Sequence, residues 1–465
     1  MRSRLSSARF AAPATVIFTI AVLTLGVGYL AKSPCLRTFT DSAGELQLDW
    51  RGARQYRSFC YSDIVPLYGA ERLDRDGLGG FPYAVSWVDG AGTPAQQLRY
   101  MEYPVLTGLF QWGNAQIAKQ FSSPGPLAGV RFFQSSAFWL SLAWLLTIWA
   151  LIRLSPGRPW DPLLAALSPL VAVHAFTNFD TLAIAAAVLG LLAWSRRRPG
   201  LAGMLLGVGG ALKLFPLFLL LPLVLLCVRA GRFRDGVRLT LLAVGTWAVV
   251  NAPIAILFPD GWAEFLRLNS RRGIDPDSIY NVFDQLTGWN GFDGALAPGE
   301  VPSVLNLFSA ALFLLACVGI AWIAFAAPRR PRVAQLAFLT VCTFLLVNKV
   351  WSPQFSLWLI PLAVLAIPRW KPLLAWMAVD ALVWFPRMLF YLGPEQGGWS
   401  IQPFLGVVVA RDLAVLALCL LVVRDIWAPG RDPLRGDGSD DPHGGVLDQA
   451  PDRLVLGDLG RTARA

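Results

Sequence analysis

Charged residues are scarce in this sequence, and their scarcity excludes an ordinary soluble domain. Asp, Glu, Lys and Arg make up only 15% of the 465 residues, whereas hydrophobic residues make up 55%. A typical soluble domain is about a quarter charged. Apolar runs of about 17 to 25 residues recur along the chain, and this length crosses a bilayer as a helix. The sequence therefore predicts an all-α polytopic membrane protein.

Histidine is nearly missing, and cysteine is sparse. The two histidines, His174 and His443, are far apart, and no Cys/His spacing resembles a metal site. Neither a metal nor another cofactor is therefore expected. Cys35 and Cys60 share one polar loop, where a disulfide is possible. The other cysteines fall within apolar runs and are expected to be small core residues: Cys227, Cys317, Cys342 and Cys419.

The formal net charge of +10 does not indicate a nucleic-acid partner, because arginine lies in short loops between apolar runs. This distribution is the positive-inside pattern of membrane proteins. It assigns Arg153 and the runs 196–198 and 329–332 to the cytoplasm. The pattern predicts a multi-pass protein of the plasma membrane with both termini in the cytoplasm.

The apolar runs and the polar stretches between them divide the chain into four segments. Residues 1–31 are expected to form a cytoplasmic N-terminal segment and the first transmembrane helix. A long first extracytoplasmic loop with interfacial helices is expected at 32–130. The transmembrane bundle is expected at 131–424, with an extracytoplasmic loop at 259–301. The remainder, 425–465, is rich in Gly, Asp and Pro and predicts a disordered cytoplasmic tail.

About 12 spans are expected in total. Residues 106–121 are too polar to cross the membrane and are expected to lie along its surface. The expected spans are 10–31, 131–152, 162–175, 178–194, 237–257, 303–326, 372–391 and 403–423, with two further pairs that meet at 213–216 and at 348–354.

The stretch 200–228 offers a choice between one long span and two short helices. A single span would bury Lys213 and would leave Arg229 on the outer side. A lysine without a partner in the membrane costs roughly 2.5–3.5 kcal/mol on insertion scales. We therefore expect two short helices that meet at residues 213–216, with Lys213 near the outer surface.

Asp63 is the first candidate for chemistry, in the stretch Cys-Tyr-Ser-Asp-Ile-Val-Pro-Leu-Tyr of the first loop. A carboxylate in such a loop can act as a general base, or it can simply cap a helix. Glu102 and Tyr103 lie later in the same loop and are expected to bind the sugar or the acceptor. Glu102 either orients the neighbours of Asp63 or simply caps the next segment. The predicted topology brings these residues to one face together with the polar turns of the bundle.

Cations and amides at the outer turns form a second group of candidates. Lys213 and Lys349 each precede a proline by a few residues, and they either extend to the interface or bind a lipid phosphate. Arg271 and Arg272 either bind the same phosphate or contact anionic head groups. Asn178 and Asp180 either bind a sugar or cap a helix. Gln354 is a further candidate for sugar binding.

Three charged residues lie inside apolar spans. Asp380 and Arg411 have similar depth when about 1.5 Å is counted per helical residue. An ion pair between two helices is expected for them, although charges in a membrane also occur in proton pathways. Asp412 lies beside Arg411.

Several short segments together resemble the actinobacterial polyprenol-phosphate-mannose-dependent α-mannosyltransferases, glycosyltransferase family 87 of the GT-C class. The resemblance covers roughly residues 10–425, and the order of the segments makes it specific. The segments are Tyr61-Ser62-Asp63 with Leu67-Tyr68, the run 102–108 (Glu-Tyr-Pro-Val-Leu-Thr-Gly), Asn178-Phe179-Asp180, the run 211–216 (Ala-Leu-Lys-Leu-Phe-Pro) and the run 349–355 (Lys-Val-Trp-Ser-Pro-Gln-Phe).

This resemblance implies a GT-C-type bundle with an extracytoplasmic active site near the first loop. Asp63 matches the general base of the family, which would deprotonate an acceptor hydroxyl. The hydroxyl would attack the anomeric carbon of polyprenyl-phosphate-mannose and form an α-mannoside on a glycolipid acceptor, while cations such as Lys213 and Lys349 stabilise the leaving phosphate. The rival hypothesis is a transporter or flippase of a lipid-linked sugar, and arabinose remains an alternative donor sugar.

Overall fold

The computed structural model describes residues 2–93, 96–122, 125–435 and 440–456. Six of the apolar segments in these residues are long enough to cross a membrane. Five are single helices and the sixth is a pair joined end to end: α1 (Arg2–Lys32), α5 (Pro126–Leu154), α11 (Phe233–Leu257), α14 (Ser303–Ala326), α19 (Ile401–Trp427), and α17 (Trp370–Leu382) with α18 (Trp384–Leu392).

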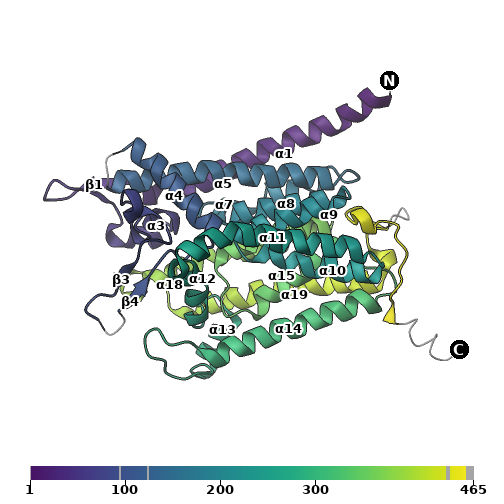
Figure 1. Ribbon diagram of the computed structural model, residues 1–465. Coiled ribbons are helices and arrows are strands. Elements are labelled where there is room, and N and C mark those ends of the chain that lie inside the picture. The colour runs from purple at the N-terminus through teal and green to yellow at the C-terminus, as the bar shows by residue number, and fades with distance from the viewer. Residues whose placement is uncertain (1, 94–95, 123–124, 436–439, 457–465) are drawn as a thin grey trace.

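Six shorter apolar segments form three hairpins between the long helices (Figure 1). Because the 14 residues of α9 rise only about 21 Å and hydrocarbon is about 30 Å thick, such arms are too short to cross it. The arms are α6 (Leu163–Ala166) with α7 (Pro169–His174), against α8 (Asp180–Ser195); α9 (Pro199–Leu212), against η4 (Phe215–Leu219) with α10 (Leu220–Arg229); and α15 (Val333–Val347), against η5 (Pro353–Trp358) with α16 (Leu359–Ala366).

The expected helix positions agree with the structure to within a few residues in most of the bundle. In particular, the predicted break in 200–228 is confirmed, because α9 ends at Leu212 and η4 begins at Phe215. Lys213 between them has an extended backbone. The described chain is mostly helical, in agreement with a polytopic all-α protein.

A smaller polar region covers one end of the bundle (left in Figure 1). It holds two antiparallel ribbons, in which Phe39 pairs with Gln47 and Val88 pairs with Leu98. Its helices and strands are β1 (Thr38–Thr40), β2 (Leu46–Leu48), α2 (Arg54–Arg57), α3 (Ile64–Ala70), β3 (Trp87–Asp89), β4 (Gln97–Arg99), α4 (Val105–Gln120), α12 (Pro259–Arg271) and α13 (Ile279–Thr287). Short 3₁₀ turns occur along the chain outside the hairpins. They are η1 (Ser33–Leu36), η2 (Arg51–Ala53), η3 (Gly77–Gly80) and η6 (Pro394–Gln396), with η7 (Pro429–Arg431) and η8 (Gly445–Leu447) in the tail.

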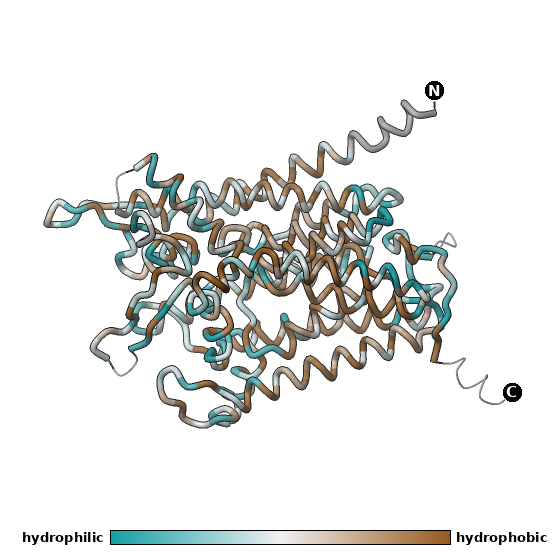
Figure 2. Tube along the Cα trace, viewed as in Figure 1, coloured by the Kyte–Doolittle hydropathy of each residue, from teal (hydrophilic) through white to brown (hydrophobic). Residues whose placement is uncertain are grey.

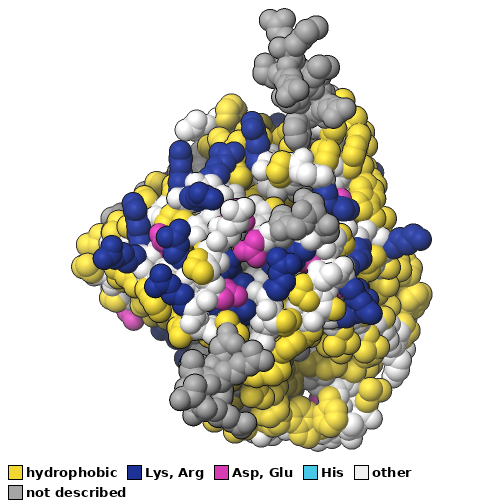
Figure 3. All heavy atoms as spheres, turned by 90° about the vertical axis from the view of Figure 1, so that its right-hand side faces the viewer, with side chains coloured by type: hydrophobic (Ala, Val, Ile, Leu, Met, Phe, Trp, Pro, Cys, Tyr) yellow, Lys and Arg dark blue, Asp and Glu magenta, His cyan; other side chains and the backbone are white. Residues whose placement is uncertain are grey.

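Hydropathy follows the same axis. Apolar residues run along the middle of the bundle, and hydrophilic residues gather towards its two ends (Figure 2). The start of α1 and the segment 440–456 lie at the end opposite the polar region (Figure 1). Lys and Arg are the commonest charged side chains on that end face (Figure 3). This asymmetry has the form of the positive-inside pattern.

Helices α9 and α11 pack closely because glycines of α9 face the backbone of α11. A Cβ on Gly203 would lie 2.2 Å from the carbonyl oxygen of Leu239, and one on Gly207 would lie 2.4 Å from that of Ala243. This spacing of small residues four apart is the one that lets helices in membranes approach closely.

The predicted disordered tail is wrong for the described part of 425–465. Helix α19 continues to Trp427, and the segments 428–435 and 440–456 pack on the arginine-rich end, where Leu447 is only 1% exposed. Tail aspartates pair with arginines of the bundle: Asp432 with Arg332, Asp440 with Arg330 and Asp452 with Arg229, each at 2.7 Å. Composition indicated disorder, but buried arginines require counter-charges. Residues 436–439 and 457–465 lie outside the described residues.

The ion pair predicted between Asp380 and Arg411 is also wrong. Asp380 accepts hydrogen bonds from Ser356 Oγ at 3.0 Å and Trp376 Nε1 at 3.1 Å. Arg411 pairs instead with Asp412, its neighbour on α19, at 2.9 Å. Equal depth along two helices therefore did not bring the two side chains together.

Candidate active site

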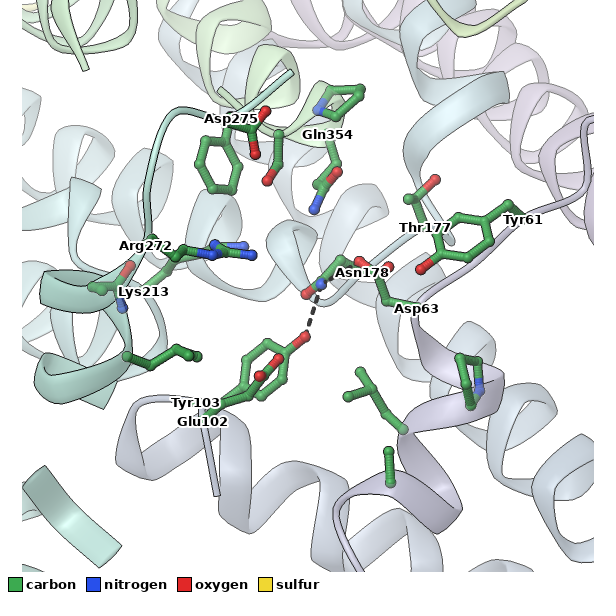
Figure 4. Close-up of a pocket in the computed structure, with 18 of the residues that line it drawn as sticks. Tyr61, Asp63, Glu102, Tyr103, Thr177, Asn178, Lys213, Arg272, Asp275 and Gln354 are labelled. Carbon is green, nitrogen blue, oxygen red and sulfur yellow. Dashed lines mark hydrogen bonds between the residues drawn. The ribbon is translucent and has the colours of Figure 1, made fainter. Parts of the chain in front are cut away.

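A cavity of about 510 Å³ opens where the polar region meets the hairpin turns, and its central part is drawn in Figure 4. This volume lies within the range of small-molecule sites, about 300–1,000 Å³. Seven of the ten predicted site residues line it: Asp63, Glu102, Tyr103, Asn178, Lys213, Arg272 and Gln354. The structure thus brings together residues that are up to about three hundred positions apart in the sequence.

Asp63 is held at the N-terminus of α3 by contacts with the first hairpin turn. Its backbone N–H donates to the carbonyl oxygen of Thr177 at 2.9 Å, and Ser62 Oγ donates to the carbonyl oxygen of Phe176 at 2.7 Å. The polar loop that follows α1 is therefore joined to the turn at 176–178 immediately beside the candidate base. Cys35 and Cys60, whose shared loop made a disulfide possible, form one a few residues earlier.

The amide of Asn178 orients the carboxylate of Asp63. Asn178 Nδ2 donates to Asp63 Oδ2 at 2.8 Å and to the hydroxyl of Tyr103 at 2.9 Å, and its Oδ1 accepts from the Phe179 N–H at 2.7 Å. Figure 4 shows Asn178 between Asp63 and Tyr103. The phenol of Tyr61 forms a further side-chain hydrogen bond with the same carboxylate. Asp63 lines the cavity, so its carboxylate is oriented by two neighbours and is still accessible to a ligand.

Lys32, at the end of α1, was missed by the sequence analysis. Its ammonium group is buried and donates to the carbonyl oxygen of Tyr61 at 2.7 Å and to Thr177 Oγ1 at 3.2 Å. It also lies 4.6 Å from the ring centre of Trp384. Lys32 thus connects both segments that position the candidate base. The only sequence signal for a role of Lys32 in the site is its position at the end of an apolar run.

Lys213 reaches the cavity as a paired cation. Its Nζ lies 2.7 Å from Asp180 Oδ1, and the same oxygen accepts from Trp358 Nε1 at 2.7 Å. Asp180 is 1% exposed and does not line the cavity, so it is placed to orient Lys213 rather than to contact a sugar. The ring of Phe355, 4.8 Å from Nζ, covers another side of the ammonium group.

Arg272 supplies the least compensated positive charge. It follows α12, and its guanidinium extends towards the centre of the cavity (Figure 4). No ion pair or side-chain hydrogen bond from the described residues engages it. By contrast, Arg387 on α18, which also lines the cavity and was not predicted, pairs with Asp277 at 2.8 Å. Arg272 is therefore the cation best placed to meet an anionic ligand.

Two further carboxyl groups face these cations. Burial raises the pKa of Glu102, and the charges of Arg272 and Arg99 oppose this shift; Arg99 pairs with Glu102 at 3.3 Å. Burial, followed by the charge of Asp277, raises the pKa of Asp275 to about 6. The cavity therefore combines weakly acidic carboxyl groups with guanidinium and ammonium groups.

Two predicted phosphate-binding residues lie outside this cavity. The ammonium of Lys349 donates to the backbone carbonyls of Arg272 and Ser270 and to Asn306 Oδ1, so it joins the end of α12 to α14. Arg271 lines a separate depression with Gln97 and Pro298. Neither lines the cavity around Asp63.

Aromatic residues form part of the wall and were not assigned to a site from the sequence. They come from the polar loop that follows α1 and from α18, and no spacing in the sequence connects these two segments: Tyr56, Tyr61, Trp384 and Tyr391. Among the described residues, no group of three or more His, Cys, Asp or Glu side chains is arranged to hold a metal ion.

Residues 125–349 match the model of glycosyltransferase family 87. This segment is just under half of the chain. No curated protein matches the sequence. The match supports the family resemblance and indicates glycosyltransferase activity. It contains Asn178, Lys213 and Arg272, whereas Asp63 precedes it.

Proposed function

We propose that this protein is an inverting glycosyltransferase that moves mannose from polyprenyl-phosphate-mannose to a lipid-anchored glycan on the outer face of the plasma membrane. The observation that carries the proposal is one cavity in which an oriented carboxylate, Asp63, faces the cations Arg272 and Lys213. A sugar phosphate requires such cations, and an attacking hydroxyl requires such a base.

In this reaction, the carboxylate of Asp63 accepts the proton of an acceptor hydroxyl. The hydroxyl oxygen forms a bond to the anomeric carbon while the bond from that carbon to the phosphate oxygen breaks. The bonding electrons leave with polyprenyl phosphate, whose added negative charge is stabilised by Arg272 and Lys213. Attack opposite the leaving group turns a β-linked donor into an α-mannoside.

The relative positions of the groups suit an in-line displacement. In Figure 4, Asp63 lies on one side of Asn178 and Arg272 on the other, so a sugar ring above Asn178 would lie between base and phosphate. Proximity of correctly aligned groups supplies much of the rate enhancement in reactions of two substrates. A dedicated acid is not required, because a phosphate monoester is already a good leaving group.

The arrangement at the opposite end favours an enzyme over a transporter or flippase. A transporter opens its binding site alternately to both faces. Here the arginine-rich end is covered by the tail, through pairs such as Asp432 with Arg332. The lining of the cavity comes from the polar region, the hairpin turns and α18. The same asymmetry supports a cytoplasmic location for both termini.

The test is transfer from radiolabelled polyprenyl-phosphate-mannose by purified protein in nanodiscs, with mannosylated glycolipids as acceptors. We expect an α-mannosidase-sensitive product from the wild type and loss of at least about 10²-fold in kcat for Asp63→Asn, since general-base catalysis contributes about 10²–10⁴-fold. Asp74→Asn, on the exposed part of the same loop, is the matched control and should be fully active.

Polyprenyl-phosphate-arabinose serves as the competing donor in the same assay. Equal or faster transfer of arabinose would overturn the proposal for mannose. Full activity of Asp63→Asn would remove Asp63 as the base. If the wild type transfers no sugar from either donor but moves the lipid-linked sugar across vesicle membranes, the transporter hypothesis replaces the enzyme.

A further inference from the structure

Three tyrosines form a stacked column along one wall of the cavity. Tyr61 and Tyr56 have ring centres 6.0 Å apart at an interplanar angle of 20°, and Tyr56 and Tyr391 have centres 5.7 Å apart at 22°. Tyr61 and Tyr56 come from the polar loop that follows α1, whereas Tyr391 comes from α18. All three line the cavity. We call Tyr61, Tyr56 and Tyr391 the tyrosine column.

The column leads from the candidate base to water. Its inner member, Tyr61, is two residues from Asp63, and burial together with the Asp63 carboxylate raises the pKa of its phenol well above the usual range. Tyr61 therefore stays protonated, and its hydroxyl hydrogen-bonds to the Asp63 carboxylate. Its outer member, Tyr391, is 36% exposed. The cations Lys213 and Arg272 come from other elements, the second hairpin turn and the end of α12.

The outer and middle members of the column are held by specific contacts. The guanidinium of Arg387 lies 4.7 Å from the ring centre of Tyr391 and is itself paired with Asp277 at 2.8 Å. Arg57 Nη2 donates to the carbonyl oxygen of Gln396 at 3.0 Å and so ties the Tyr56 segment to the turn after α18. Within the described residues, no hydrogen bond engages the hydroxyl of Tyr56, although this residue lines the cavity.

We propose that the tyrosine column is the acceptor subsite, and that it binds an oligosaccharide of at least two or three sugar units, whose terminal hydroxyl lies at Asp63. This inference rests on the proposed function and deepens it. Phenol rings combine an apolar body with a polar hydroxyl, which matches a sugar ring with its C–H groups and its hydroxyls. A single sugar would meet Tyr61 alone, whereas a longer chain meets Tyr56 and Tyr391 in turn.

The experiment compares octyl α-mannoside with the corresponding di- and trimannosides as acceptors at a saturating concentration of polyprenyl-phosphate-mannose. For the wild type, we expect kcat/KM to rise with each added sugar by about three- to tenfold, the range of one aromatic contact. Tyr391→Ala should remove the gain from the third sugar, and Tyr56→Ala the gain from the second. The donor KM should stay unchanged in both variants.

Two control variants separate this role from folding. Tyr391→Phe keeps the ring and should keep the gain. Trp399→Ala removes an exposed ring that packs on Phe385 beside the column, with centres 5.3 Å apart, but does not line the cavity, and it should behave as wild type. Equal loss for all three acceptor lengths, or a raised donor KM, would overturn the proposal.

Binding measured without catalysis distinguishes the two hypotheses. Saturation-transfer NMR should detect the trimannoside on wild-type protein and a weaker signal on Tyr391→Ala. Transfer by the wild type that does not depend on acceptor length would leave the proposed reaction intact and overturn the column as its subsite. Binding that depends on the column, without any transfer, would keep the subsite and reject the reaction. Absence of trimannoside binding overturns the subsite.

Discussion

Asn178 Nδ2 donates to Asp63 Oδ2 at 2.8 Å, and this hydrogen bond fixes the direction in which the carboxylate faces the cavity. The amide cannot turn over, because Asn178 Oδ1 accepts from the backbone N–H of Phe179. The base and its orienting group come from segments 115 residues apart. Their relation therefore depends on the contact between the polar loop that follows α1 and the first hairpin turn.

Asn178→Asp should lower kcat by about 10²-fold while the protein remains folded, because misplacement of a catalytic group by about 1 Å has this effect. A carboxylate at this position cannot donate to Asp63 and repels it. The measurement is steady-state transfer, with the donor KM determined separately. Asn281→Asp is a suitable control, because Asn281 does not line the cavity. An unchanged kcat for Asn178→Asp would contradict the orienting role.

Arg272→Ala should raise the KM for the donor by about ten- to a hundredfold, which corresponds to the loss of one charge-assisted hydrogen bond of about 1.5–3 kcal/mol. Lys349→Met should lower thermal stability instead, because the ammonium holds the carbonyl of Arg272 and the side chain of Asn306. Titration of donor analogues against both variants separates these effects. A larger change in donor KM for Lys349→Met would reverse the assignment.

Asp275→Asn should stabilise the protein at pH 8 and have little effect at pH 4. Burial raises the pKa of Asp275 to about 6 in the folded protein from an ordinary value of 3.8. The folded state therefore binds this proton more tightly than the unfolded state, and stability falls as the pH rises through about 6. Thermal unfolding of wild type and variant across this pH range measures the difference, which should vanish below pH 4. A stabilisation that is equal at all pH values would exclude ionisation as its cause.

Gly203→Ala should lower the melting temperature, whereas Gly245→Ala should leave it unchanged or raise it. A methyl group at Gly203 would lie 2.2 Å from the Leu239 carbonyl oxygen, and one at Gly245 would meet nothing within 4 Å. On an open helix face, alanine is favoured over glycine by roughly 0.5–1 kcal/mol. Differential scanning fluorimetry in detergent compares the two. Equal shifts would show that α9 and α11 can separate without cost.

The sequence predicted the helices of the bundle because long apolar runs and arginine-rich loops are local signals. The broken hairpin at Lys213 followed from the cost of burying a lone cation. The prediction of a disordered tail failed because it used local composition alone. The tail has the composition of a disordered segment, yet in the folded chain Asp432 pairs with the buried Arg332. A contact between distant segments leaves no trace in local composition.

The residues of the candidate site likewise fall into those that local sequence signals predicted and those that only the fold shows. Asp63 and Asn178 lie in polar turns flanked by apolar runs, so the sequence exposed them as candidates. Lys32 and Arg387 lie at the end of an apolar run and within one, and their partners are distant in the chain. Lys349 had the same local setting as Lys213. Its partners Ser270 and Asn306 are 79 and 43 residues away, and only the fold distinguishes the two lysines.

The short hairpins have a consequence for where the two substrates of the proposed reaction meet. Their arms have 10–17 residues, whereas the six long segments have 23–29, so we expect the turns, which include Asn178 and Lys213, to lie deeper than the ends of the long helices. Removing each methylene of a lipid chain from the bilayer costs about 0.8 kcal/mol. A reaction centre below the membrane surface lets the prenyl tail stay in the hydrocarbon region while its head group reacts. The water-soluble glycan must then enter the cavity, and the depth of the turns sets how many of its sugars the protein encloses.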